Sequence, residues 1–125
     1  MDYNAHDSME NEFGNAMDNC IAECQDCHDI CTQTVMHCLE AGGEQATPDH
    51  LGFLLDCAEI CQTSANFMLR ESALHGRTCS VCAEACERCA QSCRRFPDDD
   101  IMQVCADSCY SCAQSCREMA AMEGG

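Results

Sequence analysis

Small and apolar residues recur along this chain every three or four positions, and the pattern is interrupted at three places. A repeat of three and four residues puts the recurring side chains on one face of an α-helix. Glycine or proline stands at each interruption, where it ends one helix and precedes the next. The pattern predicts helices over residues 17–41, 48–75, 78–95 and 98–122, with residues 1–16 as an N-terminal extension that can hold a short additional helix.

Residues at the predicted helix ends suit these boundaries. Thr47 can cap the second helix with Pro48 in its first turn, and Thr78 can cap the third. The acidic run from Asp98 to Asp100 suits the positive N-terminal end of the fourth helix. Four helices with short loops predict an all-α fold, an antiparallel up-down-up-down four-helix bundle. Because 125 residues are typical of one domain, we expect residues 1–125 to form a single domain.

Cysteine occupies the positions that should form the core of this bundle. The chain has 16 cysteines, and within each predicted helix they are separated by three, four or seven residues. This spacing places the thiols of a helix on one stripe, where a bundle normally carries leucine and isoleucine. We therefore expect a cysteine-lined core. The cysteines are Cys20, Cys24, Cys27, Cys31, Cys38, Cys57, Cys61, Cys79, Cys82, Cys86, Cys89, Cys93, Cys105, Cys109, Cys112 and Cys116.

The same stripes predict which residues close the two ends of the core. Antiparallel connections bring a methionine-rich set together at one end, namely Phe13, Met17, Met68, His75 and Met119. At the other end they bring together a mixed set, namely Cys38, His50, Leu54, Cys93, Phe96 and Met102. The second end therefore offers imidazole and thioether groups in addition to thiols.

The spacing of the thiols favours Cu(I) over other metals. Residues four apart on a helix have Cβ atoms about 5 to 6 Å apart, so a CxxxC pair can hold a two-coordinate ion. Cu(I) accepts thiolates and thioethers in two- or three-coordinate sites, whereas Zn²⁺ prefers a tetrahedron. One Cu(I) per thiolate would neutralise the core, whereas four Zn²⁺ would neutralise only half of the 16 thiolates. We expect the chain to store multiple Cu(I) ions on its cysteines, with Met102 as a further ligand and His50 as either a ligand or a polar core cap.

Other functions remain open on the sequence alone. One is a zinc- or cadmium-sequestering protein of metallothionein type; others are a thiol redox or interaction protein with inter-helix disulfides, and an electron-transfer protein. No catalytic constellation is visible, so we do not expect an enzyme. His28 and His37 lie off the cysteine stripe, where we expect solvated surface positions, and we expect His6 and His75 in terminal or loop segments.

The charge of the chain restricts its partners. It has 22 acidic and 6 basic residues, all six of them arginine, and a net charge of −16. Such a surface repels nucleic acids and anionic lipids, so we expect neither nucleic acid nor membrane as a partner. The N-terminal segment lacks the basic start and apolar run of an export signal. We therefore expect a cytoplasmic protein, in a compartment that keeps thiols reduced.

Three cysteine-rich segments resemble those of the cytosolic copper storage proteins, the Csp family of cysteine-rich four-helix bundles. They are CIAECQDCHDIC, CSVCAEACERCAQSC and CADSCYSCAQSCREM, and the resemblance runs from about Cys20 to Met119. It implies a homotetramer of bundles that bind many Cu(I) ions through thiolates, with entry at one open end. A copper chaperone or an efflux protein would be a partner in that role.

This chain departs from the family pattern in two places. Family members often place histidines just before the fourth helix, near the mouth, whereas this chain has the segment PDDDIM there. Asp98, Asp99, Asp100 and Met102 therefore replace those histidines. The second helix carries only two cysteines, with His50 where another thiol could stand.

Apolar residues beside the cysteine rows predict an oligomer. A core already filled by sulfur leaves these side chains needing another partner. They are Ile21, Val35, Leu39, Leu51, Leu55, Ile60 and Phe67.

Overall fold

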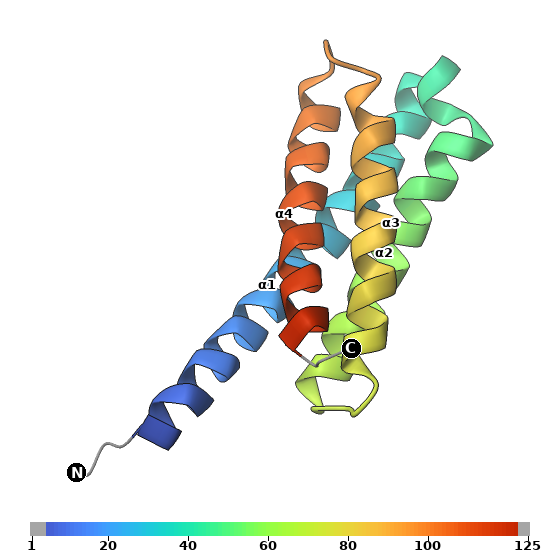
Figure 1. Ribbon diagram of the computed structural model, residues 1–125. Helices are drawn as coiled ribbons and strands as arrows, with labels where there is room; N and C mark the ends of the chain where they lie inside the picture. Colours follow the sequence, from blue (N-terminus) through green and yellow to red (C-terminus); the bar gives the residue numbers. More distant parts are fainter. Residues whose placement is uncertain (1–4, 123–125) are drawn as a thin grey trace.

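The structure is a computed structural model that describes residues 5–122, with only the backbone described for residues 5–13. Within this part of the chain all regular elements are helical. Consecutive helices run antiparallel, and each packs against two neighbours, α1 and α3 both lying between α2 and α4 (Figure 1). This confirms the predicted all-α four-helix bundle. The elements are α1 (Ala5–Ala41), the short 3₁₀ helix η1 (Gly43–Ala46), α2 (Pro48–Leu69), α3 (His75–Arg94) and α4 (Asp100–Met122).

The first helix is longer than the sequence pattern predicted. It begins at Ala5 and runs without a break to Ala41. The prediction of a separate short helix before Met17 was therefore wrong. Its N-terminal part projects beyond the other three helices (Figure 1). Gly14 does not end the helix, because a single glycine inside a helix costs only about 1 kcal/mol relative to alanine. The helix ends instead at Gly42 and Gly43, whose φ angles of 70° and 60° need glycine.

The boundary between α2 and α3 also differs from the prediction. The second helix ends at Leu69 rather than near residue 75, because Glu71 takes a left-handed φ of 50° and the Ser72 N–H donates back to the Phe67 carbonyl at 2.9 Å. The third helix begins at His75, three residues before the predicted cap. Thr78 therefore lies inside α3, where its hydroxyl donates to the His75 carbonyl at 3.0 Å.

The other two predicted starts agree better with the structure. Thr47 caps α2, because its hydroxyl oxygen accepts from the His50 N–H at 3.3 Å, and Pro48 is the first helical residue. The fourth helix begins at Asp100, two residues later than predicted. Its cap is Asp99, whose carboxylate accepts from the Met102 N–H at 3.1 Å. The acidic run therefore serves the start of α4 through one specific residue.

The core between these helices consists mainly of sulfur and small side chains. The cysteine rows are flanked on α3 and α4 by buried alanines, which let the helices approach closely. Among the largest fully buried side chains are Leu54, Met68, Met102 and Met119. Within residues 5–122, no helix combines the length and the apolar character that crossing a membrane requires.

Candidate metal centre

All 16 cysteines lie in the core. Each is a free thiol, and each has no exposed surface. Regular helices bring this about, because the three- and four-residue spacing keeps every sulfur on the inward face of its helix. The structure therefore confirms the cysteine-lined core that the spacing predicted.

The thiols form a connected network along the bundle. Cys57 on α2 contacts a thiol on each of the other three helices: its sulfur lies 3.7 Å from Cys27 on α1, 3.4 Å from Cys86 on α3 and 3.8 Å from Cys109 on α4. Three pairs of thiols four residues apart on one helix have similar spacings of 3.9 to 4.0 Å. These pairs are Cys27 with Cys31, Cys57 with Cys61, and Cys82 with Cys86.

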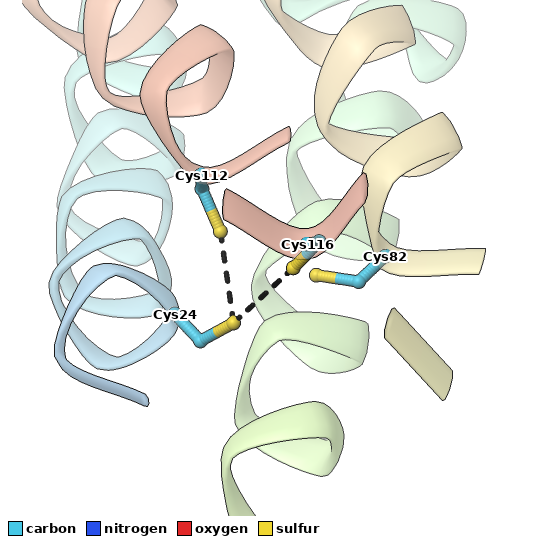
Figure 2. Close-up of side chains that lie close together, drawn as sticks. All are labelled: Cys24, Cys82, Cys112 and Cys116. Carbon is cyan, nitrogen blue, oxygen red and sulfur yellow. Dashed lines mark hydrogen bonds between the residues drawn. The ribbon is translucent and has the colours of Figure 1, made fainter. Parts of the chain in front are cut away.

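Groups of four thiols recur along this network. Figure 2 shows one of them, in which Cys24 of α1 faces Cys112 and Cys116 of α4 and Cys82 of α3. The Cys24 sulfur lies 3.7 Å from that of Cys112 and 3.6 Å from that of Cys116. Within each such group all four sulfur atoms lie within 4.8 Å of one another. Successive groups share members, among them Cys109 and Cys112, so one thiolate can bridge two ions.

The sulfur spacing suits a small, soft ion with few ligands. Two thiolates at about 2.3 Å from one metal lie about 4.0 Å apart in a trigonal site and about 4.6 Å apart in a linear one. The observed spacings of 3.4 to 4.0 Å therefore need only small outward movements to hold Cu(I). A tetrahedral Zn²⁺ site would use four thiolates about 3.8 Å apart, so the spacing admits Zn²⁺ as well. Charge favours Cu(I), because four Zn²⁺ ions would neutralise only half of the 16 thiolates.

Two thiols near the ends of the network have raised pKa values and hold their protons at neutral pH. Burial, together with the negative charge of Asp99 and the neighbouring thiols Cys105 and Cys89, raises the pKa of Cys38 from 9.0 to about 11. The hydrogen bond with Cys112 is the main cause that raises the pKa of Cys24, also to about 11. Metal binding at these positions must therefore displace protons.

The mixed end contains the groups that the sequence predicted there. The Cys38 thiol donates to the Met102 thioether at 3.7 Å, and both residues have no exposed surface. The rings of His50 and Phe96 lie 5.1 Å apart between their centroids. Leu54 and Cys93 are also fully buried. The α1 C-terminus, the α2 N-terminus and the turn between α3 and α4 thus form one end with thiol, thioether and imidazole groups.

His50 is the one candidate ligand with nitrogen. Its Nδ1 lies 2.7 Å from the Ser92 hydroxyl, which also accepts from Arg95 at 3.0 Å. Its Nε2 is buried and makes no hydrogen bond to the residues whose side chains are described. Burial, and to a lesser extent the charge of Arg95, lowers the pKa of His50, so the ring is neutral at pH 7. In the tautomer whose Nδ1–H donates to Ser92, Nε2 has a free lone pair for a metal.

Three histidines do not lie where the sequence predicted. His28 and His37 are half-buried and bridge helices, rather than occupying a solvated face: His28 donates to the Ala58 carbonyl at 2.7 Å, and His37 bonds Asp99 at 2.7 Å. His75 is not a loop residue, because it begins α3 and is only 5% exposed. Off-stripe positions of a bundle still face the adjoining helix, which the stripe pattern does not reveal. His6 lies in α1, but its side chain is outside the described residues.

The methionine-rich end is also buried. Met68 and Met119 are 1% exposed and Met17 is 8% exposed. The Cys79 thiol donates to the Met68 thioether at 3.7 Å, a contact that the sequence did not predict. His75, which was predicted here as well, is also buried, and the side chain of Phe13 lies outside the described residues.

Comparison with known proteins gives the family of this bundle. A family model described as "Copper storage protein" matches residues 14–121. The chain belongs to the copper storage protein family. A comparison with curated proteins found no relative.

Solved structures of similar chains include two that are described as copper storage proteins. The Cu(I)-bound copper storage protein BsCsp3 is 32% identical, with 84% of this chain and 98% of that chain covered and a TM-score of 0.79. The Ccsp protein of Streptomyces lividans loaded with 10 copper equivalents is 29% identical, with 86% and 85% covered and a TM-score of 0.75. The Nmul_A1745 protein of Nitrosospira multiformis is 45% identical, with 87% and 98% covered and a TM-score of 0.82.

In this member of the copper storage protein family, the acidic segment from Asp98 to Asp100 has a structural role. Asp99 accepts hydrogen bonds from the Met102 N–H and from the Gln45 side chain at 2.9 Å, and it pairs with His37. Burial alone would raise the pKa of Asp99, but the hydrogen bonds from His37, Met102 and Gln45 outweigh it and lower the pKa to about 2. Asp99 therefore joins α1, η1 and α4 across the mixed end. Asp98 and Asp100 are exposed.

Proposed function

We propose that this protein binds and stores many Cu(I) ions inside its four-helix bundle. The observation that carries the proposal is the continuous network of buried, free thiols, whose sulfur atoms lie 3.4 to 4.0 Å apart. Such a network offers overlapping two- and three-coordinate sites rather than a few separate ones. The family is described as copper storage proteins, and the BsCsp3 structure is described as Cu(I)-bound. Both descriptions support Cu(I) as the stored metal.

The ligands we propose are the 16 cysteines together with Met102 and His50. Met102 already contacts the Cys38 thiol, and the buried Nε2 of His50 lacks a hydrogen-bond partner among the described residues. Both groups are neutral, so they add ligands at the mixed end without adding negative charge. In this proposal residues 1–125 act as one storage domain without catalytic activity.

A titration of the reduced, metal-free protein with Cu(I) in competition with a chromophoric chelator tests the proposal. We expect saturation at about one Cu(I) per cysteine, because shared thiolates support one ion each. The same titration with Zn²⁺ should saturate at about four ions, since each needs four ligands. Saturation with one or two Cu(I) per chain would contradict storage, and a preference for Zn²⁺ over Cu(I) would favour a metallothionein-like function.

We also propose a cytoplasmic location, because free thiols in this number need a reducing compartment. In the same proposal the protein is a homotetramer that exchanges copper with a chaperone or an efflux protein. Leu39 on α1 and Leu55 on α2 support oligomerisation, since they are 52% and 55% exposed, whereas Ile21 is buried within the subunit and does not. Light scattering that shows a monomer at micromolar concentration would contradict this part of the proposal.

A further inference from the structure

The methionine-rich end contains a sulfur cluster that differs from the rest of the network. The Cys79 thiol at the start of α3 lies 3.7 Å from the Met68 thioether near the end of α2. Cys79 has no exposed surface, and Met68 is 1% exposed. Two more thiols influence the pKa of Cys79, namely Cys20 of α1 and Cys116 of α4, and their sulfur atoms lie 3.7 Å from each other. All four helices therefore contribute one sulfur atom at this level.

Met68 takes the place of a thiol in this cluster. It lies seven residues after Cys61, so it continues the inward row of Cys57 and Cys61 on α2 by one heptad. A methionine that only fills space does not need to present its sulfur to a thiol. The contact is repeated at the opposite end, where Cys38 and Met102 are also 3.7 Å apart. Each end of the thiol network thus finishes in a pair of one thiol and one thioether.

We propose that Cys79 and Met68 bind one Cu(I) ion, with Cys20 and Cys116 beside them, as the terminal site of the network. On binding, the Cys79 thiol loses its proton to solvent and its sulfur bonds to the metal, while the Met68 thioether contributes a lone pair and releases nothing. A thioether is a soft, neutral ligand that suits Cu(I) but not Zn²⁺. This site is therefore selective for Cu(I), and it rests on the proposed storage function.

Selenium NMR of the full-length protein labelled with ⁷⁷Se-selenomethionine tests the site. Single methionine-to-leucine variants assign the selenium resonances. On saturation with Cu(I) alone, the Met68 resonance should shift several-fold more than that of Met119. Met119 is the matched control for burial: it is also 1% exposed, but it makes no hydrogen bond to a thiol among the residues whose side chains are described. A Met68 shift no larger than that of Met119 would overturn the site.

Copper capacity gives a second measurement on unlabelled protein. Met68→Leu nearly conserves volume, so the bundle should still fold. In competition with a Cu(I) chelator it should lose one Cu(I) per chain. Met36→Leu should lose none, because Met36 is 59% exposed on the outer face of α1. Full capacity in Met68→Leu would overturn the site while leaving storage intact, whereas a wild-type capacity of one or two ions would refute storage itself.

Discussion

Replacing Cys57 with alanine should remove more copper than one lost thiol would suggest. The Cys57 sulfur contacts one thiol on every helix, at 3.7 Å from Cys27, 4.0 Å from Cys61, 3.4 Å from Cys86 and 3.8 Å from Cys109. A thiolate in that position bridges two ions, so its removal should lower capacity by about two Cu(I) per chain. Four remaining thiols would then surround a gap in the middle of the network.

The same variant should destabilise the metal-free protein only moderately. Alanine lacks one buried sulfur atom, and the packing around it closes only in part. We expect a loss of about 1 to 2 kcal/mol in the free energy of unfolding, from lost burial and the remaining cavity. For a bundle of this size that corresponds to a fall of roughly 3 to 8 °C in Tm. Circular dichroism under reducing conditions measures this fall and shows that the variant is still folded.

Cys38→Ala is the matched control. Cys38 is equally buried, but its one sulfur contact among the described side chains is the Met102 thioether at 3.7 Å. Its removal should therefore lower capacity by about one ion. Both variants are titrated with Cu(I) against the same chelator. Equal losses of one ion in Cys57→Ala and Cys38→Ala would refute the reasoning, because each thiol would then bind its own ion independently of the network.

Three further predictions concern the protein before it is loaded. The reduced, metal-free chain should be helical by circular dichroism and its Tm should rise with copper load, because Cu(I) binds the folded thiols; a chain that folds only with metal would contradict this. The pKa of Cys38 is about 11 in the folded protein, so this thiol keeps its proton at a pH where the unfolded chain loses it. As the pH rises from 9 to 11, the free energy of unfolding measured with urea should therefore fall more steeply for wild type than for Cys38→Ala. Parallel pH profiles would argue against that cause. Asp99→Ala removes the α4 cap and the bonds to His37 and Gln45, so urea unfolding should show a loss of about 1 to 3 kcal/mol. Copper capacity should stay unchanged, and a fall in capacity would mean that Asp99 also acts on the metal sites.

Several features of the site followed from the sequence because they depend on helix periodicity alone. Spacings of three, four and seven residues put every thiol on an inward face, whatever the neighbouring helix contributes. Antiparallel connections then predicted that Cys38 and Met102 meet at one end, and these two side chains are in contact. The Thr47 cap followed from local chemistry in the same way.

Other features depended on how the helices align and could not be read from one helix at a time. The pairing of His37 with Asp99, 62 positions later, and the bond from His28 to Ala58 arise where two helices adjoin beside the core. A stripe pattern treats such flanking positions as surface. The start of α3 at His75 likewise depends on the left-handed turn at Glu71. A glutamate in the sequence does not indicate this conformation.

The sequence by itself determined that sulfur fills the core, because side-chain direction repeats with the turn of the helix. Only the tertiary structure decided which thiols become neighbours, since that depends on the relative heights of four helices set by their turns and packing. It placed Cys57 among four thiols from all four helices, and it brought Met68 to Cys79 and His50 to Ser92. Metal sites need several ligands within a few ångströms, and helices far apart in the chain meet that requirement only once they are packed.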